Sequence, residues 1–390
     1  MGIEPKVDRA INEALKSKEF FCKFLTANDS GASGGHQSGI LISSTLYDYF
    51  FEKDKIRSSS SKKLCAQVSW DNGIKTDSVI TWYSSKKELR LTRFGRGFDL
   101  INPKETGSLF VLIRQLENEY QAYILQVEDE IQKFLDSFGL TPIETNRLIK
   151  PDKVSDFQDE INSYIKSCGH DFPTTSAISV KAKELLIEHD QNKFNTLKDP
   201  DQALIQWNDI EYDIFKKLEE SIYGQEIFHG FSDIEEFIKA ANSILNRRKS
   251  RAGKGLENHL ASIFDDNEIR YTAQGITEGN KRPDFVFPSI EAYHDINFLI
   301  ENLCSLAAKT TCKDRWRQIL NEGDRFRDQN KYLCTLQRGI SEQQLNEMEK
   351  EKVVLVVPKV YIKEYPQKKR SDIMTISEFI KYVKSKQEDL

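Results

Sequence analysis

The sequence predicts an α+β protein with a mostly β amino-terminal domain and an α/β carboxyl-terminal domain. From Gly39 to Leu125, apolar runs are short and separated by turn residues, and this spacing favours a barrel of short strands. From Gln206 onward, strands alternate with helices, which is typical of an α/β core. With 390 residues, the chain is long enough for two or three domains. We predict a first domain at 1–150, a hinge at 151–175 and a second domain at 176–390.

The amino-terminal elements follow from local patterns. Charged and apolar residues at helical spacing predict a helix over Lys6–Phe24, and the glycines between Thr26 and Gln37 predict an exposed loop. Another helix is expected over Glu128–Phe138, ended by Gly139. The predicted strands are Ile40–Ile42, Leu64–Trp70, Ser78–Tyr83, Leu89–Leu91 and Leu109–Leu112.

The carboxyl-terminal elements are read in the same way. The predicted helices are Ile210–Leu218, Ile234–Leu245, Leu256–Phe264, Ser341–Lys350 and Ile376–Lys384. The predicted strands are Arg282–Pro288, Asn302–Lys309, Tyr332–Leu336 and Val353–Val357. We therefore expect the sheet of this domain to carry whatever chemistry follows its strands.

The net charge, the cysteine spacing and the apolar runs of the sequence limit the kinds of function that the protein can have. The formal net charge is −5, so no overall positive field attracts nucleic acid, and any DNA surface must be a local basic patch such as Lys309–Arg317. The six cysteines include no Cys-x₂-Cys pair, which argues against a structural zinc site or a disulfide framework. The sequence has neither a signal-peptide pattern nor an apolar run of membrane-spanning length, so we expect a cytoplasmic protein without membrane contact.

Two predicted strands bring a carboxylate and a lysine together. Asp284 lies near the beginning of one strand, and Lys309 closes the apolar run of the other, an unusual place for a lysine. After Lys309, Asp314 can cap a helix that presents Glu322 on one face. Two carboxylates can hold a hard cation such as Mg²⁺, and a lysine can stabilise the charge of phosphodiester hydrolysis. We therefore predict Asp284, Lys309 and Glu322 as catalytic residues, with Asp284 and Glu322 as the metal ligands.

The order Pro-Asp and then Lys resembles the nuclease pattern Pro-Asp…(Asp/Glu)-x-Lys, and one position departs from it. Ala307 stands two residues before Lys309, where the pattern has an acid, and we expect Glu322 to supply that carboxylate from the following helix. This arrangement resembles the EcoRII family of type II restriction endonucleases. The resemblance covers most of residues 205–390, and its strongest segments are Asn246–Leu260, Ile276–Phe285 and Lys309–Glu322.

The resemblance implies a Mg²⁺-dependent type II (type IIE) endonuclease with a restriction-endonuclease-like fold that cuts a CCNGG- or CCWGG-type site. Lys313, Asp314 and Arg315 are then the base readers, because Arg can bond to O6 and N7 of G and Asp can accept from N4 of C. A two-fold target implies a homodimer. A cognate DNA methyltransferase of the same restriction-modification system is a functional partner.

The amino-terminal domain resembles the effector domain of the same family, a DNA-binding pseudobarrel. Its two candidate arms are the Gly-rich loop with His36 and the segment Arg90–Gly97. By this resemblance His36, Arg93 and Arg96 are base readers, while Lys23 and Arg90 contact phosphates. The resemblance also implies that this domain covers the catalytic cleft until it binds a further copy of the site.

Two other residues are assigned less directly. Glu257, on the polar side of its helix, is predicted as a further acidic catalytic group near the metal, and the alternative is an ordinary helix charge. Trp207 corresponds to a residue that lines a pocket for unpaired central bases in the family, and the alternative is that it packs a helix end. The rival functions are a DNA-binding regulator with an inert nuclease centre and a DNA-repair nuclease.

Overall fold

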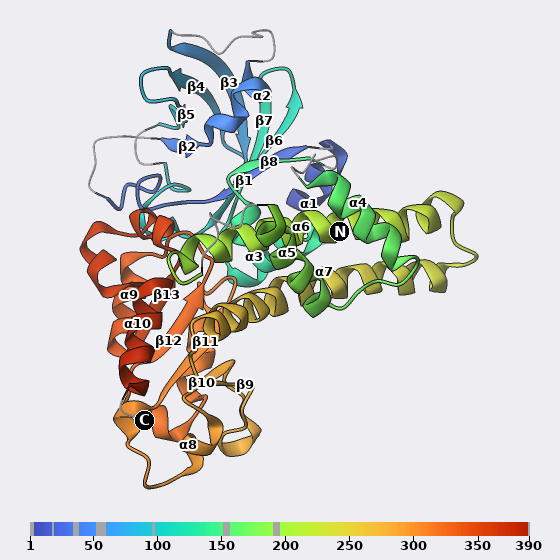
Figure 1. Cartoon of the computed structure of the whole chain (residues 1–390). Helices are drawn as coiled ribbons and strands as arrows, with labels where there is room; N and C mark the ends of the chain where they lie inside the picture. Colours follow the sequence, from blue (N-terminus) through green and yellow to red (C-terminus); the bar gives the residue numbers. More distant parts are fainter. Residues whose placement is uncertain are drawn as a thin grey trace.

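The computed structural model describes residues 4–17, 19–33, 39–51, 60–95, 98–150, 157–189 and 196–388. The structure contains two sheets, one of eight strands and one of six. Figure 1 shows the eight-stranded sheet at the top and the six-stranded sheet below it, with two long helices that extend to one side. The prediction of an α+β fold with a mostly β amino-terminal domain is confirmed.

The eight-stranded sheet has the order β2-β5-β4-β3-β7-β6-β1-β8. Its strands pair antiparallel, except for β3 and β7, which pair parallel. The strands are β1 (Phe20–Phe24), β2 (Ile40–Ile42), β3 (Lys62–Trp70), β4 (Lys75–Tyr83), β5 (Glu88–Thr92), β6 (Leu109–Leu116), β7 (Glu119–Leu125) and β8 (Arg147–Ile149). The helices of this part are α1 (Lys6–Ser17), α2 (Tyr47–Phe50) and α3 (Glu128–Phe138), and the last was predicted with these bounds.

The predicted helix over Lys6–Phe24 is wrong in its second half. Helix α1 ends at Ser17, and Phe20–Phe24 form strand β1. All five side chains of β1 are buried, since the strand lies between β6 and β8 in the sheet. Tertiary pairing of a run rich in phenylalanine therefore overrides the helical spacing of its few charges.

The six-stranded sheet has the order β14-β13-β12-β11-β10-β9. Strands β11 to β14 are parallel, while β9 and β10 are antiparallel to their neighbours. The strands are β9 (Thr272–Ala273), β10 (Phe285–Phe287), β11 (Cys304–Lys309), β12 (Lys331–Thr335), β13 (Val353–Val357) and β14 (Met374–Thr375). Each of the four predicted strands is found here, with ends that shift by a few residues.

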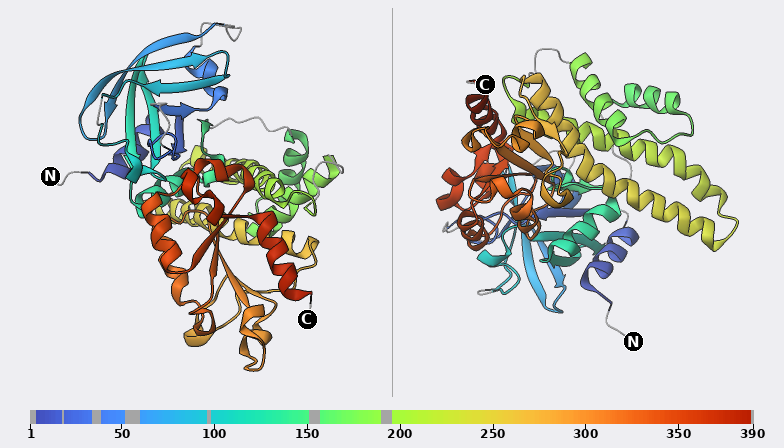
Figure 2. Two further views of the ribbon diagram at one scale, coloured as in Figure 1. Left: turned by 90° about the vertical axis from the view of Figure 1, so that its left-hand side faces the viewer. Right: turned by 90° about the horizontal axis from the view of Figure 1, so that it is seen from below.

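Two helices of this domain are much longer than the sequence predicted, while the last two match the prediction to within three residues. They are α4 (Gln158–Cys168), α5 (Thr175–His189), α6 (Pro200–His229), α7 (Ile234–Asp266), α8 (Ile290–His294), α9 (Glu342–Lys350) and α10 (Ile376–Gln387). The two helices predicted over Ile234–Leu245 and Leu256–Phe264 are one continuous helix, α7. Helices α6 and α7 form a hairpin that projects from the sheet (Figure 2).

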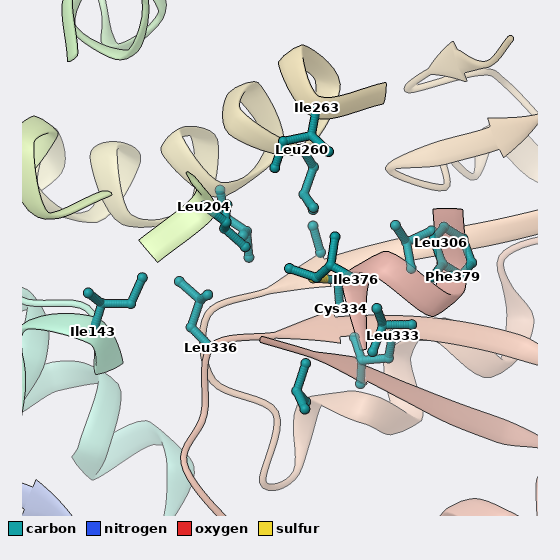
Figure 3. Close-up of a cluster of buried hydrophobic side chains, with 14 of the residues drawn as sticks. Ile143, Leu204, Leu260, Ile263, Leu306, Leu333, Cys334, Leu336, Ile376 and Phe379 are labelled. Carbon is teal, nitrogen blue, oxygen red and sulfur yellow. The ribbon is translucent and has the colours of Figure 1, made fainter. Parts of the chain in front are cut away.

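The core of the six-stranded sheet continues beyond the predicted domain boundary. Figure 3 shows Ile143 and Leu204 beside Leu336, and Leu260 beside Ile376. Ile161 of α4 belongs to the same buried cluster. The predicted hinge at 151–175 therefore includes a helix, α4, that packs with the carboxyl-terminal domain.

Candidate active site

Asp284 stands immediately before β10, and the register of the sheet brings it beside the end of β11. Phe285 pairs with Leu306 in antiparallel register, so Asp284 faces the segment that leads to Lys309. Asp284 Oδ2 accepts from the backbone N–H of Ala308 over 2.8 Å and from Lys309 Nζ over 3.0 Å. Asp284 is only 6% exposed. The sheet therefore brings together the aspartate and the lysine that the sequence predicted.

Glu322 completes the acidic pair from the segment after β11. This segment is a 3-10 helix, Arg315–Asn321, rather than an α-helix, and the Asp314 side chain does not cap it as predicted. Thr277 Oγ1 donates to the backbone carbonyl of Glu322 over 2.5 Å and ties the end of the 3-10 helix to the loop before β10. Burial and the nearby Asp284 charge raise the pKa of Glu322 to about 8, against the opposing effect of Lys309.

The donor set fits a divalent cation held by few protein ligands. Burial and the Asp284 charge both disfavour the charged form of Glu322, and a bound cation would offset the repulsion between the two carboxylates. Within the described residues, no three His, Cys, Asp or Glu side chains form a closed cage. Mg²⁺ commonly binds through one or two carboxylates and keeps several waters. Asp284 and Glu322 are therefore suited to Mg²⁺ as its one or two carboxylate ligands.

Glu257 reaches the site through a residue that the sequence reading missed. Gln274 Nε2 donates to Asp284 Oδ1 over 2.9 Å and to Glu257 Oε2 over 3.1 Å. Lys254 Nζ also lies 2.8 Å from Glu257 Oε2. Gln274 directly follows the two-residue strand β9, which the sequence did not predict. Its neutral amide gave no signal in the sequence, because only the pairing of β9 with β10 places it beside Asp284.

The predicted base-reading segment faces the amino-terminal domain. Lys313 is only 8% exposed, and its Nζ donates to Ser108 Oγ over 2.8 Å. Burial lowers the pKa of Lys313, while nearby acidic groups, Glu105 first, oppose that change. Asp314 is exposed and Arg315 is half-buried. In this conformation a base edge could not reach the Lys313 ammonium without displacing Ser108.

Glu128, the first residue of α3, is the centre of this contact. Its Oε1 accepts from Thr311 Oγ1 over 2.9 Å, and its Oε2 accepts from the backbone N–H groups of Asp314 and of Arg315, the latter over 2.7 Å. The Arg315 Nε lies 3.9 Å from Glu128 Oε1. One buried carboxylate of the amino-terminal part thus holds the segment that carries the predicted base readers.

The other end of α3 is held by α7. Arg248 Nη1 donates to the carbonyl of Ser137, and Arg251 Nη1 donates to that of Gly139 over 3.1 Å. Arg251 Nη2 lies 3.1 Å from Glu144 Oε1, and both side chains are buried. Figure 1 shows α3 between the upper sheet and the helices below it. Helix α3 therefore spans the boundary with contacts at both ends.

Comparisons with known proteins show the family to which the chain belongs. The family model described as "Restriction endonuclease EcoRII, N-terminal" matches residues 14–142, and the one described as "EcoRII C terminal" matches residues 215–380. The type II restriction enzyme EcoRII of Escherichia coli is 38% identical over 384 residues, which cover 92% of each chain. This chain belongs to the EcoRII family of type II restriction endonucleases. It is a DNA-binding enzyme of the site-specific deoxyribonuclease class.

Other relatives cover one part of this EcoRII-family enzyme. The type II restriction enzyme SsoII of Shigella sonnei is 28% identical over 141 residues, 34% of this chain and 45% of that enzyme. Metal-depleted Ecl18kI in complex with uncleaved DNA aligns with a TM-score of 0.47 and 20% identity over 62% of this chain and 86% of that chain. The complex of PspGI with substrate DNA aligns with a TM-score of 0.46 and 16% identity, over 61% and 100% of the two chains.

The predicted effector arms of the EcoRII-family chain adjoin each other where they are described. Strand β2 pairs antiparallel with β5, so Gly39, at the end of the first arm, lies against Leu91 and Thr92 at the start of the second. Gly39 has a φ of +112°, and a Cβ there would lie 2.6 Å from the carbonyl oxygen of Leu91. Arg93 is exposed. His36 and Arg96 lie outside the described residues.

Lys23 and Arg90, predicted to contact phosphates, are buried instead. Lys23 is 3% exposed, and its Nζ lies 2.6 Å from Asp29 Oδ2 and donates to the carbonyl of Leu41 over 2.8 Å. Arg90 Nε lies 3.3 Å from Glu88 Oε1. Because the Lys23 ammonium is enclosed by these partners, it holds β1 to β2 rather than facing solvent. In this conformation neither side chain presents its charge to a DNA backbone.

Trp207 is a core residue of α6 in this structure. Its side chain is 1% exposed, its ring lies 5.7 Å from that of His259, and Lys183 Nζ lies 5.2 Å from the indole centre. A base that stacks needs access to a ring face, and both faces are covered by protein here. The packing alternative therefore describes Trp207 in this conformation, and the structure corrects the expectation of an open pocket.

The described residues contain no helix long and apolar enough to cross a membrane.

Proposed function

We propose that this enzyme cuts both strands of a short CCNGG- or CCWGG-type DNA site with Mg²⁺. We also propose that its amino-terminal domain keeps the enzyme closed until it binds a further copy of the site. The observation that carries the proposal is the adjacency of the Asp284–Lys309–Glu322 centre to a base-reading segment that Glu128 and Ser108 cover. The catalytic residues and the proposed base readers thus lie next to each other in the chain. The contact of the amino-terminal domain with this segment would therefore control both cleavage and base reading.

Each residue of the centre has a distinct part in hydrolysis. Asp284 and Glu322 would hold the cation, and the cation supplies polarisation of the phosphoryl group and a more acidic water. Lys309 Nζ, held 3.0 Å from Asp284, is placed to stabilise the charge that develops on the phosphate or the attacking water. The Ala308 N–H and Lys309 Nζ both donate to Asp284 Oδ2 and so fix the orientation of its carboxylate.

Cation binding is expected to strengthen as pH rises toward about 8. The raised pKa of Glu322 means that its carboxyl is protonated at neutral pH without the metal, and a cation must displace that proton. Between about pH 6.5 and pH 7.5, the Ca²⁺ affinity measured by calorimetry should rise by up to about tenfold per pH unit, with release of about one proton, and then level off above about pH 8.5. Equal affinities at the two lower pH values would contradict the role of Glu322.

The closed form follows from the contacts of Glu128. The Glu128 carboxylate accepts hydrogen bonds from the backbone N–H groups of Asp314 and Arg315, which lie in the segment proposed to contact DNA. A site copy bound to the amino-terminal domain would favour an open form if that form bound the copy more tightly than the closed form. His36, Arg93 and Arg96 are the proposed readers of this second copy.

The α6–α7 hairpin offers a surface for the homodimer that a two-fold target requires. Phe228 is 86% exposed and Ile234 is 71% exposed, and Ile227, Phe237 and Ile238 are exposed beside them. Figure 2 shows this end of the hairpin away from both sheets. An apolar stripe of this kind on a soluble protein marks an interaction site.

Charge favours a second copy of the chain as the occupant of this surface. Helix α7 begins with Glu235 and Glu236, and farther along the same helix Lys249 is exposed, whereas Arg248 is bound to Glu219 and the carbonyl of Ser137. In an antiparallel two-fold pairing, the acidic start of one α7 faces Lys249 of the other, twice. The hairpin is thus self-complementary in both apolar and charged groups.

Substitution of the stripe is expected to dissociate the dimer. Phe228→Ser combined with Ile234→Glu and Phe237→Glu should give a monomer by analytical ultracentrifugation, with an unchanged circular dichroism spectrum, because these side chains pack on little else within one chain. Leu116→Glu, at an equally exposed leucine of β6, is the matched control and should leave the dimer intact. A triple variant that sediments as a dimer would exclude this surface.

A plasmid digest with and without Mg²⁺ tests the proposed function against its rivals. Discrete fragments that require Mg²⁺ indicate restriction of a defined site. A smear, or cutting that depends on DNA structure, indicates a repair nuclease, and no cutting indicates a DNA-binding regulator. DNA treated with the methyltransferase of the same system should resist the digest.

A further inference from the structure

Gln274 is held against Asp284 by both its backbone and its side chain. The N–H of Gln274 donates to the carbonyl of Asp284 over 3.1 Å, next to the pairing of Ala273 with Phe285. Gln274 has a φ of +53°, a left-handed conformation that is costly for a residue other than glycine. The surrounding contacts must therefore outweigh this cost to keep the amide in place.

The side-chain NH₂ group of Gln274 has two N–H donors, and it has two carboxylate acceptors, one on Asp284 and one on Glu257. A carboxylate can only accept from the NH₂ end, so the contacts to Asp284 Oδ1 and Glu257 Oε2 fix which end of the amide faces the site. Asp284 Oδ2 is already fixed by Ala308 N and Lys309 Nζ. Because Gln274 donates to Oδ1, both oxygens of the Asp284 carboxylate have a hydrogen-bond donor, and the rotation of the carboxylate is fixed.

We propose that Gln274 is a positioning residue that orients Asp284 for the cation, and that Glu257 acts through Gln274 as its anchor rather than as a ligand of the cation. This inference rests on the proposed metal-dependent cleavage. Glu257 Oε2 accepts from Gln274 and also meets Lys254 Nζ, so its charge is already balanced.

The first test compares Ca²⁺ affinity, measured by calorimetry, with the single-turnover rate of DNA cleavage in Mg²⁺. Gln274→Ala should lower both by about 10–100-fold, as loss of a hydrogen bond to a metal ligand does elsewhere, while the Kd for DNA without metal stays within about twofold. Gln115→Ala is the matched control, because Gln115 Nε2 makes the same kind of contact with Glu13 Oε2, over 3.0 Å, in the other domain. The control should change neither value.

The second test separates an anchor from a metal ligand. Glu257→Gln keeps an oxygen that accepts from Gln274, whereas Glu257→Ala removes it. The anchor role predicts that Glu257→Gln binds Ca²⁺ about tenfold or more tightly than Glu257→Ala. The anchor role also predicts that Glu257→Ala costs no further Ca²⁺ affinity when it is added to Gln274→Ala, and a further loss of about tenfold or more in the double variant would overturn the assignment.

These outcomes distinguish the inference from the proposed function. If the unsubstituted enzyme cuts no DNA with Mg²⁺, the proposed function fails. If it cuts, and Gln274→Ala binds Ca²⁺ and cuts as well as the unsubstituted enzyme, the positioning role of Gln274 fails while the proposed function stands. Thermal unfolding of each variant shows whether a loss comes from the site or from the fold.

Discussion

Asp284→Ala, Lys309→Ala and Glu322→Ala are each expected to abolish DNA cleavage, with losses of about 10³-fold or more. The first and third variants remove the carboxylates proposed to hold the cation. The second removes the positive charge held 3.0 Å from Asp284. None of the three side chains reads a base, so the Kd for the specific site should stay within a few fold, since affinity comes mainly from phosphate and base contacts.

The measurements are single-turnover cleavage in Mg²⁺ and DNA binding in Ca²⁺ or without metal. Arg315→Ala provides the contrast, because it should weaken specific binding by about 1–3 kcal/mol per lost base contact. Asp284→Asn keeps the shape of the side chain and tests whether its charge is what matters. Appreciable DNA cleavage by Glu322→Ala would contradict the proposal that the segment after β11 supplies the second carboxylate.

Glu128→Ala is expected to give the largest gain of activity. The Glu128 carboxylate accepts from Thr311, Asp314 and Arg315, and the loss of such charged contacts should destabilise the closed form by about 1.5–3 kcal/mol. Cleavage of DNA with a single site should therefore accelerate by about 10–100-fold. Asp129→Ala is the matched control, since Asp129 is the exposed neighbour in the same turn of α3.

Removal of the whole amino-terminal part should act in the same direction. A boundary near residue 165 would remove Ile161, which is buried in the core of the catalytic sheet, so the truncation is better placed at 151–156, where it still removes Ile143 and the Glu144 partner of Arg251. The shortened enzyme should cut single-site DNA at least as fast as Glu128→Ala. If the truncated enzyme and Glu128→Ala both still need two sites, the closed form proposed for this enzyme is wrong.

The catalytic strands could be predicted because their signal is local. The apolar run before Lys309 and the Pro-Asp pair before Phe285 each mark a buried strand, and antiparallel pairing then brings Asp284 to Lys309. Helix α3 was also predicted with its bounds, since its acidic first turn and Gly139 mark both ends. Where the pattern lies within one element, propensity and burial agree.

The remaining features depend on contacts that no local pattern encodes. Glu128 and Thr311 are 183 residues apart, and nothing near either one indicates the other. The segment after Asp314 forms a 3-10 helix, without a side-chain cap, where it contacts Glu128. Tryptophan and paired lysine side chains occur both in binding sites and in protein cores. Only the fold shows that Trp207 and Lys23 are buried here.

The most direct measurement is to sequence the DNA ends made by the full-length enzyme in Mg²⁺, with Asp284→Ala digested in parallel. The proposed function predicts that nearly all ends map to one short CCNGG- or CCWGG-type sequence, cut on both strands at a fixed offset, and that Asp284→Ala yields none of them. Ends scattered over unrelated sequences, or the same ends from Asp284→Ala, would contradict a site-specific endonuclease whose chemistry resides at Asp284, Lys309 and Glu322.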